Sequence, residues 1–186
     1  NVILGKRSIT LWGADSIVDR LCGLRFRLSP HSFYQVNHAQ TEKLYRLAAQ
    51  AAALTGKETL LDLYCGTGTI GLSMAHTAGA VIGVEVVEAA VRDAKKNASA
   101  NHIRNARFIC ADAAQAAAQL AGEGTQVDVV VLDPPRKGCS PDLIDTVAQM
   151  APERVVYVSC DPATLARDLK LFAAKGYRTA WVQPVD

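Results

Sequence analysis

The fold of this chain is decided by a strand that runs into a glycine-rich turn, Thr59-Leu60-Leu61-Asp62-Leu63-Tyr64-Cys65-Gly66-Thr67-Gly68-Thr69-Ile70-Gly71. The apolar run over residues 59–64 predicts a buried strand, and the glycines after it are typical of a tight turn into a helix. Glu85 ends the next predicted strand, where a carboxylate can accept hydrogen bonds from ribose hydroxyls. This order of elements indicates an α/β domain that binds a nucleotide-like cofactor.

Strand and helix patterns alternate regularly from residue 59 onward. We expect strands at 59–64, 80–85, 106–110, 127–132, 154–159 and 177–182. Helices are expected near 69–78, 87–100, 112–121, 141–150 and 162–175. Continuous apolar strands such as Val129-Val130-Val131-Leu132 indicate burial on both faces. The pattern predicts a mostly parallel sheet with helices on both of its faces.

Residues 1–30 differ from this alternation. Ile9-Thr10-Leu11-Trp12 and Leu24-Arg25-Phe26-Arg27-Leu28 read as short strands. We interpret 1–30 as a short β lead-in, the remnant of an upstream domain, and 31–186 as the main domain. In that domain Asn37 is a suitable N-cap for a helix whose predicted apolar face comprises Leu44, Leu47, Ala48, Ala51 and Leu54.

The composition places the chain among soluble globular proteins, with 49% hydrophobic and 20% charged residues. No apolar run approaches the roughly 20 residues of a membrane helix, and no leader pattern is present, so we expect no membrane association. The five cysteines are odd in number and form no CxxC pair, which argues against a metal site and favours a reducing, cytoplasmic location. A net charge of +2 neither requires nor excludes a nucleic-acid partner.

The glycine turn alone fits two cofactors, a nicotinamide dinucleotide and S-adenosylmethionine. Asp62 favours the second, because a carboxylate there can meet an amino-acid ammonium group, whereas a pyrophosphate would gain nothing from that charge. Asp112 follows the third predicted strand and suits either an adenine contact or a helix N-cap. Asp133 precedes two prolines in Asp133-Pro134-Pro135-Arg136, a stiff turn that suits a site residue better than a simple bend.

Cys160 ends the strand pattern Val155-Val156-Tyr157-Val158-Ser159 and stands directly before a helix signal, the N-cap Asp161 with Pro162 after it. Backbone N–H groups at a helix start favour a thiolate. An ordinary buried cysteine is the alternative. We favour a nucleophile, because the carboxyl ends of parallel strands bring Cys160, Asp133 and the glycine turn to one edge of the sheet.

Together these residues resemble the RNA uracil-C5 methyltransferases that use S-adenosylmethionine, especially the 23S ribosomal RNA branch. The likeness runs from about residue 21 to residue 186. It is carried by four motifs: Ser32-Phe33-Tyr34-Gln35-Val36-Asn37, Asp62-Leu63-Tyr64-Cys65-Gly66-Thr67-Gly68, Asp133-Pro134-Pro135-Arg136-Lys137-Gly138 and Ser159-Cys160-Asp161-Pro162-Ala163-Thr164-Leu165. Transfer-RNA members usually have a proline where this chain has Val36.

The resemblance implies a Rossmann-like class I methyltransferase fold and an RNA substrate. The sequence shows no evident protein partner. Cys160 would attack C6 of the target uracil, and the methyl donor would lie among Gln35, Tyr64, Gly66, Thr69, Glu85, Asp112 and Asp133. Family members continue into a Phe-Pro…His-Val-Glu segment, which supplies a last strand and the glutamate that acts as general base. This sequence ends at Gln183-Pro184-Val185-Asp186, so we expect a catalytic domain truncated at its C-terminal end, with its base outside the chain.

Three other functions stay open at this stage. A nicotinamide-dependent oxidoreductase would leave the Asp-Pro-Pro-Arg turn and Cys160 unexplained. An amine-directed nucleic-acid methyltransferase commonly has an aromatic residue after the two prolines, where Arg136 stands here. A non-catalytic RNA-binding or assembly module could retain the same fold.

Overall fold

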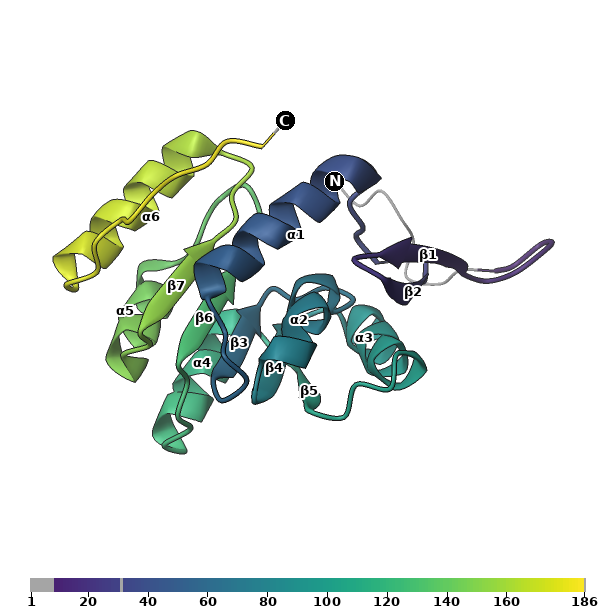
Figure 1. The fold of residues 1–186 in the computed structure, drawn as a ribbon, viewed down its shortest axis with the longest axis horizontal. Coiled ribbons are helices and arrows are strands. Elements are labelled where there is room, and N and C mark those ends of the chain that lie inside the picture. The colour runs from purple at the N-terminus through teal and green to yellow at the C-terminus, as the bar shows by residue number, and fades with distance from the viewer. Residues whose placement is uncertain (1–8, 31, 186) are drawn as a thin grey trace.

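The computed structural model describes residues 9–30 and 32–185, and its centre is a parallel sheet of five strands in the order β5-β4-β3-β6-β7 (Figure 1). These strands are β3 (Thr59–Leu63), β4 (Ala80–Glu85), β5 (Ala106–Cys110), β6 (Val129–Leu132) and β7 (Arg154–Tyr157). The chain order reverses beside β3, because β3 pairs with β4 on one side and β6 on the other. Ligands of open α/β sheets bind at such a reversal, outside the carboxyl ends of the strands.

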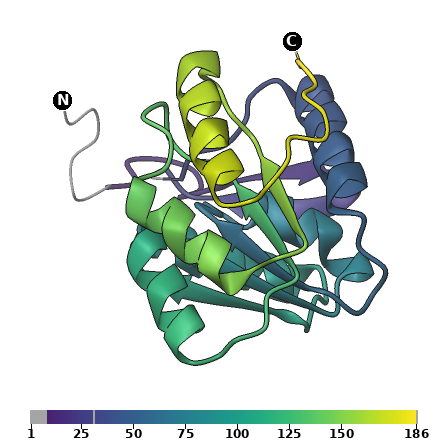
Figure 2. The ribbon, with the colours of Figure 1, turned by 90° about the vertical axis from the view of Figure 1, so that its left-hand side faces the viewer.

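Helices cover both faces of the sheet. They are α1 (His38–Ala52), α2 (Thr69–Met74), the 3₁₀ turn η1 (Ala75–Thr77), α3 (Glu88–Ala100), α4 (Ala113–Gly122), α5 (Pro141–Met150) and α6 (Pro162–Ala174). Figure 2 shows α4, α5 and α6 on one side of the sheet and α1 on the other. The prediction of a mostly parallel sheet between helices is confirmed. None of the described helices has both the length and the apolarity to cross a membrane.

Two apolar clusters form the core, one on each face of the sheet. Successive residues of a strand point to opposite faces, so Leu60 joins the cluster with α1, α2 and α3, while Leu61 joins the cluster with α4, α5 and α6. Val129 and Val130 divide in the same way. This two-sided burial explains why these strands read as continuous apolar runs.

An antiparallel hairpin, β1 (Ile17–Leu21) and β2 (Leu24–Leu28), lies beside α3 (Figure 1). Asn97 on α3 and Asn101, which caps the C-terminal end of this helix, bind the edge of β2. Asn101 Oδ1 accepts from the N–H of Arg25 at 2.8 Å, and Asn97 Oδ1 accepts from the N–H of Arg27 at 2.7 Å. Each asparagine also donates to the carbonyl of the same arginine. The asparagine side chains therefore form the hydrogen bonds that a neighbouring strand would form with the backbone of β2, and these bonds attach the hairpin to the domain.

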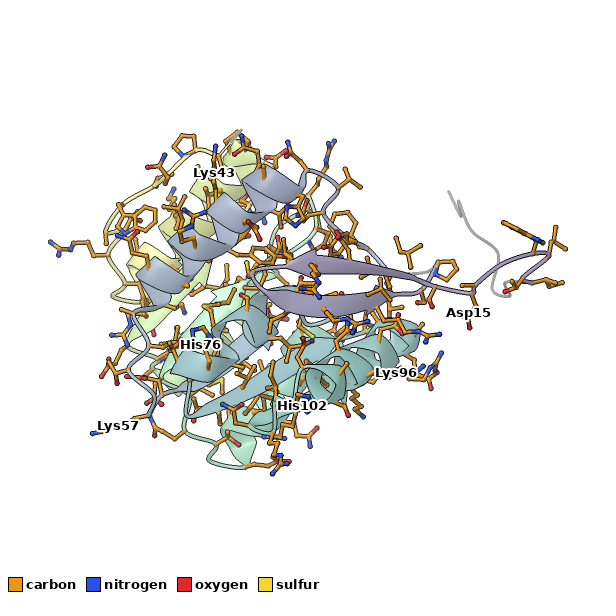
Figure 3. All side chains as sticks on the ribbon, turned by 45° about the vertical axis from the view of Figure 1, so that its right-hand side comes forward. Asp15, Lys43, Lys57, His76, Lys96 and His102 are labelled. Carbon is orange, nitrogen blue, oxygen red and sulfur yellow. The ribbon has the colours of Figure 1, made fainter. Side chains whose placement is uncertain are left out.

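Two predicted strands are wrong. Residues 177–182 form no strand, because in the described chain no neighbour pairs with them. Tyr177 instead packs edge-on against Phe172, with ring centres 5.7 Å apart, and donates to the carbonyl of Pro152. Residues 9–12 also form no strand; Trp12 is 94% exposed. They lie in the loop that leads through Asp15 to the hairpin (Figure 3).

The predicted apolar face of α1 is partly wrong. The fully buried positions are Thr41, Tyr45, Ala48 and Ala52, whereas Leu44 and Leu54 are only half-buried at the border of the core. The hydroxyl of Tyr45 finds a partner in the hydroxyl of Thr69 on α2, at 2.7 Å. That hydrogen bond allows a polar side chain to face the sheet, which an apolar pattern alone does not predict.

Candidate active site

The glycine turn links the carboxyl end of β3 to α2. The N–H of Cys65 donates to the carbonyl of Val84, which ties the turn to the adjacent strand β4. Gly66 and Gly68 have φ angles of +55° and +82°, in the left-handed region that glycine adopts without a steric penalty. Tyr64 also has a positive φ, +66°, which is costly for an aromatic residue. Such strain is typical of positions where the side chain is required at a site.

Asp62 lies beneath this turn and is 1% exposed. Its Oδ2 accepts from the N–H of Gly71 at 2.8 Å, and a Cβ at Gly71 would stand 2.8 Å from that same oxygen. The other oxygen, Oδ1, has no hydrogen-bond partner among the described residues. Burial, together with the nearby carboxylates Asp133 and Glu85, raises the pKa of Asp62 to about 7, although the hydrogen bond from Gly71 opposes this shift.

A small cavity opens beside the glycine turn. Its lining brings together five of the residues predicted to bind the cofactor: Gln35, Tyr64, Gly66, Thr69 and Asp133. Phe33, Tyr34, Tyr45, Cys65, Thr67 and Ile70 complete it. Burial raises the pKa of Asp133 to about 6, since a carboxylate loses hydration in this position. A much larger hollow of about 580 Å³ lies along β5 and the end of α3, and none of the predicted site residues lines it.

Glu85 and Asp112 lie outside the lining of this cavity. Glu85 ends β4, where its Oε2 accepts from the N–H of Gly66 at 3.1 Å and its Oε1 accepts from the N–H of Val87 at 2.8 Å. It thus touches the glycine turn directly. Asp112 is the N-cap of α4, and one oxygen, Oδ1, accepts from both Ala114 and Gln115. Of the two roles predicted for Asp112, an adenine contact or a helix N-cap, the structure shows the N-cap.

The segment before α1 closes one side of the cavity, and α3 holds it in place. Asp93 on α3 accepts from the N–H of Ser29 at 3.0 Å and from the hydroxyl of Ser32 at 3.1 Å. Asn97, one turn later, donates both to β2 and to the carbonyl of Thr67 in the glycine turn. One face of α3 therefore positions both the glycine turn and the start of the segment that carries Gln35.

Cys160 is exposed and stands between β7 and α6, as predicted. Asp161 caps α6, with its Oδ1 accepting from the N–H groups of Ala163 and Thr164, both at 2.9 Å. These contacts, led by that of Thr164, lower the pKa of Asp161. The hydroxyl of Ser159 accepts from the N–H of Asp161 and donates to its carbonyl. Both neighbours of Cys160 are therefore fixed, although Cys160 itself does not line the cavity.

Three further residues belong to this region and were not predicted from the sequence. Phe33 lines the cavity although it is 75% exposed. Asn97 is 1% exposed, and Asp168 on α6 is fully buried. Phe33 could have been predicted, because it belongs to the Ser32–Asn37 motif that also contains Gln35. The helical patterns around Asn97 and Asp168 carried no such signal, because their partners are distant in the sequence.

The sequence profile described as tRNA (Uracil-5-)-methyltransferase matches residues 15–178. The chain belongs to the tRNA (uracil-5-)-methyltransferase family. This confirms the family suggested by the four motifs. The match does not distinguish the branch that acts on 23S ribosomal RNA from those that act on other RNAs.

Curated relatives agree with this family. A protein of Clostridium tetani described as an uncharacterized RNA methyltransferase is 52% identical over the whole chain, which covers 40% of that protein. A Listeria innocua protein of the same description is 50% identical over the whole chain, which covers 41% of it. The chain therefore spans about two fifths of the length of the curated relatives it matches.

Solved structures show the same fold. The tRNA (uracil-54, C5)-methyltransferase of Pyrococcus abyssi, in complex with S-adenosyl-L-homocysteine, superposes with a TM-score of 0.75 and 31% identity, over 90% of this chain and 42% of that one. A SAM-dependent methyltransferase of Agrobacterium tumefaciens superposes with a TM-score of 0.67 over 91% of this chain and 59% of that one. At 18% identity, the second likeness concerns the fold alone. The Rossmann-like methyltransferase fold is confirmed.

Proposed function

We propose that this chain is the catalytic part of an enzyme that transfers a methyl group from S-adenosylmethionine to C5 of a uridine in RNA. The observation that carries the proposal is the acidic character of the cofactor cleft. Glu85 accepts from the N–H of Gly66, Asp62 accepts from the N–H of Gly71, and Asp133 lines the cavity beside the same turn. Such a cleft attracts the cationic sulfonium and ammonium groups of S-adenosylmethionine and repels the pyrophosphate of a dinucleotide.

The residues at the cleft fit this cofactor. Glu85 ends β4, where a carboxylate can hold ribose hydroxyls, and Asp62 retains a buried oxygen without a partner among the described residues. Gln35, Tyr64, Thr69 and Asp133 line the cavity between the turn and the segment before α1. Asp112 would contact the adenine with the oxygen that its cap leaves unused. When bound, S-adenosylmethionine supplies an electrophilic methyl group.

Cys160 is proposed as the nucleophile. Its Sγ forms a bond to C6 of the uracil, and the electron pair of the C5–C6 double bond moves toward C5 and the C4 carbonyl. C5 would then carry the electron density that attacks the methyl group, whose bond to sulfur would break with release of S-adenosylhomocysteine. A base removes the C5 proton, the double bond re-forms, and the thiolate leaves. We assign none of the residues of this chain to that deprotonation. The target base would be flipped out of its RNA stack.

For the substrate we propose 23S ribosomal RNA, on the likeness of the Ser32–Asn37 motif, in which Val36 stands where transfer-RNA members usually have proline. The test is methylation by the full-length protein of 23S ribosomal and transfer RNA transcripts with labelled methyl donor. We expect labelled 5-methyluridine in ribosomal RNA only. Label confined to transfer RNA would overturn the substrate. Binding of NADH without binding of S-adenosylhomocysteine, measured by calorimetry, would overturn the cofactor and favour an oxidoreductase.

A further inference from the structure

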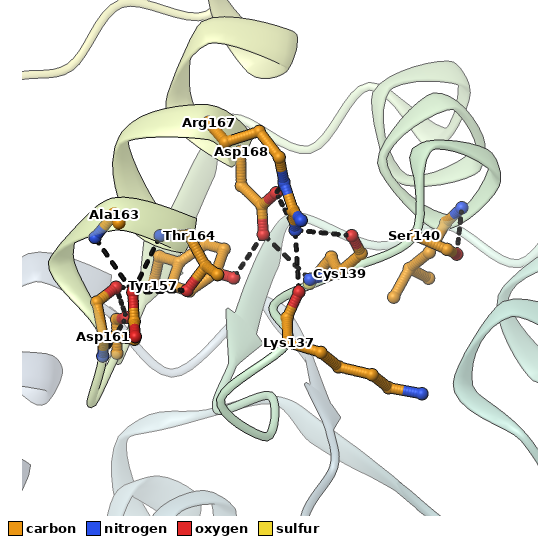
Figure 4. Close-up of polar contacts among 11 residues, drawn as sticks. Lys137, Cys139, Ser140, Tyr157, Asp161, Ala163, Thr164, Arg167 and Asp168 are labelled. Atoms are coloured by element: carbon orange, nitrogen blue, oxygen red, sulfur yellow. Dashed lines mark hydrogen bonds and ion pairs between the residues drawn. The ribbon is translucent and has the colours of Figure 1, made fainter.

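A fully buried carboxylate, Asp168 on α6, joins the helix to two segments at the site edge (Figure 4). Its Oδ2 accepts from the hydroxyl of Tyr157, at the end of β7, at 2.6 Å. The same oxygen accepts from the backbone N–H of Cys139, in the loop after β6, at 2.8 Å. Its Oδ1 pairs with the guanidinium of Arg167, with Nη2 at 2.7 Å and Nε at 2.8 Å. Both oxygens are thus fully engaged.

Arg167 extends these contacts along the loop after β6. Its Nη2 donates to the carbonyl of Lys137 at 2.8 Å and to that of Cys139 at 3.2 Å (Figure 4). Between these residues Gly138 has a φ of +73°, and a Cβ there would stand 2.5 Å from Asp168 Oδ2 and 2.6 Å from Arg167 Nη2. The loop backbone therefore lies directly against the Arg167–Asp168 pair, with no room for a side chain.

This arrangement is costly for a purely structural contact. Removing a carboxylate from water is unfavourable, and apolar residues of similar size often hold two elements together equally well. Unlike apolar contacts, the charged pair fixes the orientation of the elements it joins, because four of its hydrogen bonds go to specific atoms of the loop and of β7. The loop begins at Asp133, which lines the cofactor cavity, and α6 begins directly after Cys160 and its neighbour Asp161.

We infer that Asp168, supported by Arg167, is a positioning residue for the methyl transfer: it fixes the Asp133–Cys139 loop against the helix whose N-terminus follows Cys160. The inference rests on the proposed function, since it assigns Cys160 and Asp133 their roles in that reaction. The influence of Arg136 in lowering the pKa of Asp161 agrees with it, because that arginine of the loop must lie near the start of α6. Asp168 itself touches neither reactant.

The test measures how fast Cys160 forms a covalent adduct with 5-fluorouridine-substituted RNA in the full-length protein, with saturating S-adenosylmethionine. Asp168→Asn keeps the side-chain shape but removes the ion pair with Arg167. The matched control is Asp145→Asn, which removes an exposed ion pair to Lys175 that also links α5 to α6. We expect the adduct rate to fall about tenfold or more in Asp168→Asn and to stay unchanged in Asp145→Asn, because small displacements of reacting groups are costly.

Affinity for S-adenosylhomocysteine separates positioning from a general loss of structure. Asp168 and Arg167 hold the loop at Lys137 and Cys139, the end away from Asp133, and make no hydrogen bond to Glu85 or the glycine turn. We therefore expect the dissociation constant to change less than about fivefold while the adduct rate falls about tenfold. An adduct rate equal to that of the wild type in folded Asp168→Asn would overturn the inference. So would parallel losses of rate and affinity.

Two results keep this inference distinct from the proposed function. If the wild type methylates RNA without any adduct, the proposed mechanism has failed and the positioning role falls with it. If the wild type forms the adduct, the proposed mechanism stands, and the adduct rates of the variants then test the positioning role of Asp168. Should Asp168→Asn fail to fold, Tyr157→Phe removes a single hydrogen bond to Asp168, and an unchanged adduct rate in that variant would overturn the inference.

Discussion

The carboxylate beneath the glycine turn makes the protein less stable as the pH rises. The pKa of Asp62 is about 7 in the folded chain, against 3.8 for an unperturbed Asp, and each pKa unit corresponds to about 1.4 kcal/mol. Between these values the folded chain retains a proton that the unfolded chain has lost. The free energy of unfolding therefore falls as pH rises from about 4 to 7, and above pH 7 the loss reaches an upper limit of about 4 kcal/mol.

Asp62→Asn removes this dependence. Asn is neutral and its Oδ1 can still accept from the N–H of Gly71, but its buried amide gains no obvious partner, which costs roughly 1–3 kcal/mol at every pH. The informative quantity is the difference in unfolding free energy between variant and wild type. We expect that difference to shift in favour of the variant by up to about 4 kcal/mol between pH 4 and pH 8.

The assay is urea unfolding of both proteins, followed by circular dichroism at several pH values without cofactor. Asp133 also has a pKa raised by burial, and both proteins contain it, so that contribution cancels in the comparison, while the repulsion between Asp133 and Asp62 is already part of the raised pKa of Asp62. Parallel stability curves for the two proteins would refute the reasoning, because they would mean that Asp62 is ionised in the folded chain at low cost. The same variant should bind S-adenosylhomocysteine more weakly if Asp62 contacts the ammonium group.

Three other variants test the surroundings of the cleft. Asn97→Ala should lower the free energy of unfolding by about 2 kcal/mol in urea titrations, because it leaves the N–H of Arg27 without its acceptor; equal stability would contradict this. Glu85→Gln should weaken S-adenosylhomocysteine binding about tenfold in calorimetry by replacing a charged acceptor for ribose, and unchanged affinity would remove Glu85 from the site. Asp145→Asn should change the thermal midpoint by no more than a degree or two, since its ion pair with Lys175 is exposed; a large shift would contradict that estimate.

The central sheet could be predicted from the sequence because each strand carries its own signal. Burial on both faces demands an unbroken apolar run, and the run at Val129–Leu132 is buried throughout. The glycine turn could also be predicted, since glycine adopts the left-handed backbone angles at Gly66 and Gly68 without a steric penalty. The carboxyl-end rule then placed Asp133 and Cys160 at the same edge of the sheet as this turn.

Features that depend on distant partners could not be predicted. Residues 177–182 have strand-like composition, but a strand needs a neighbour, and none pairs with them in the described chain. The buried charge of Asp168 depends on the N–H of Cys139, 29 residues away, and on the hydroxyl of Tyr157. Asn97 similarly depends on Arg27, 70 residues away. Sequence patterns report local burial, whereas these side chains are buried because donors or acceptors arrive from other elements.

The most direct test of the uracil-C5 mechanism is an adduct experiment with the full-length protein, labelled methyl donor and 5-fluorouridine-substituted 23S ribosomal RNA on a denaturing gel. Fluorine at C5 cannot leave as a proton, so the attacking cysteine remains bound to the RNA after methyl transfer. We predict a labelled protein–RNA band that disappears in Cys160→Ala. Methyl transfer to RNA without any such band would contradict the account, and it would make Cys160 a structural residue.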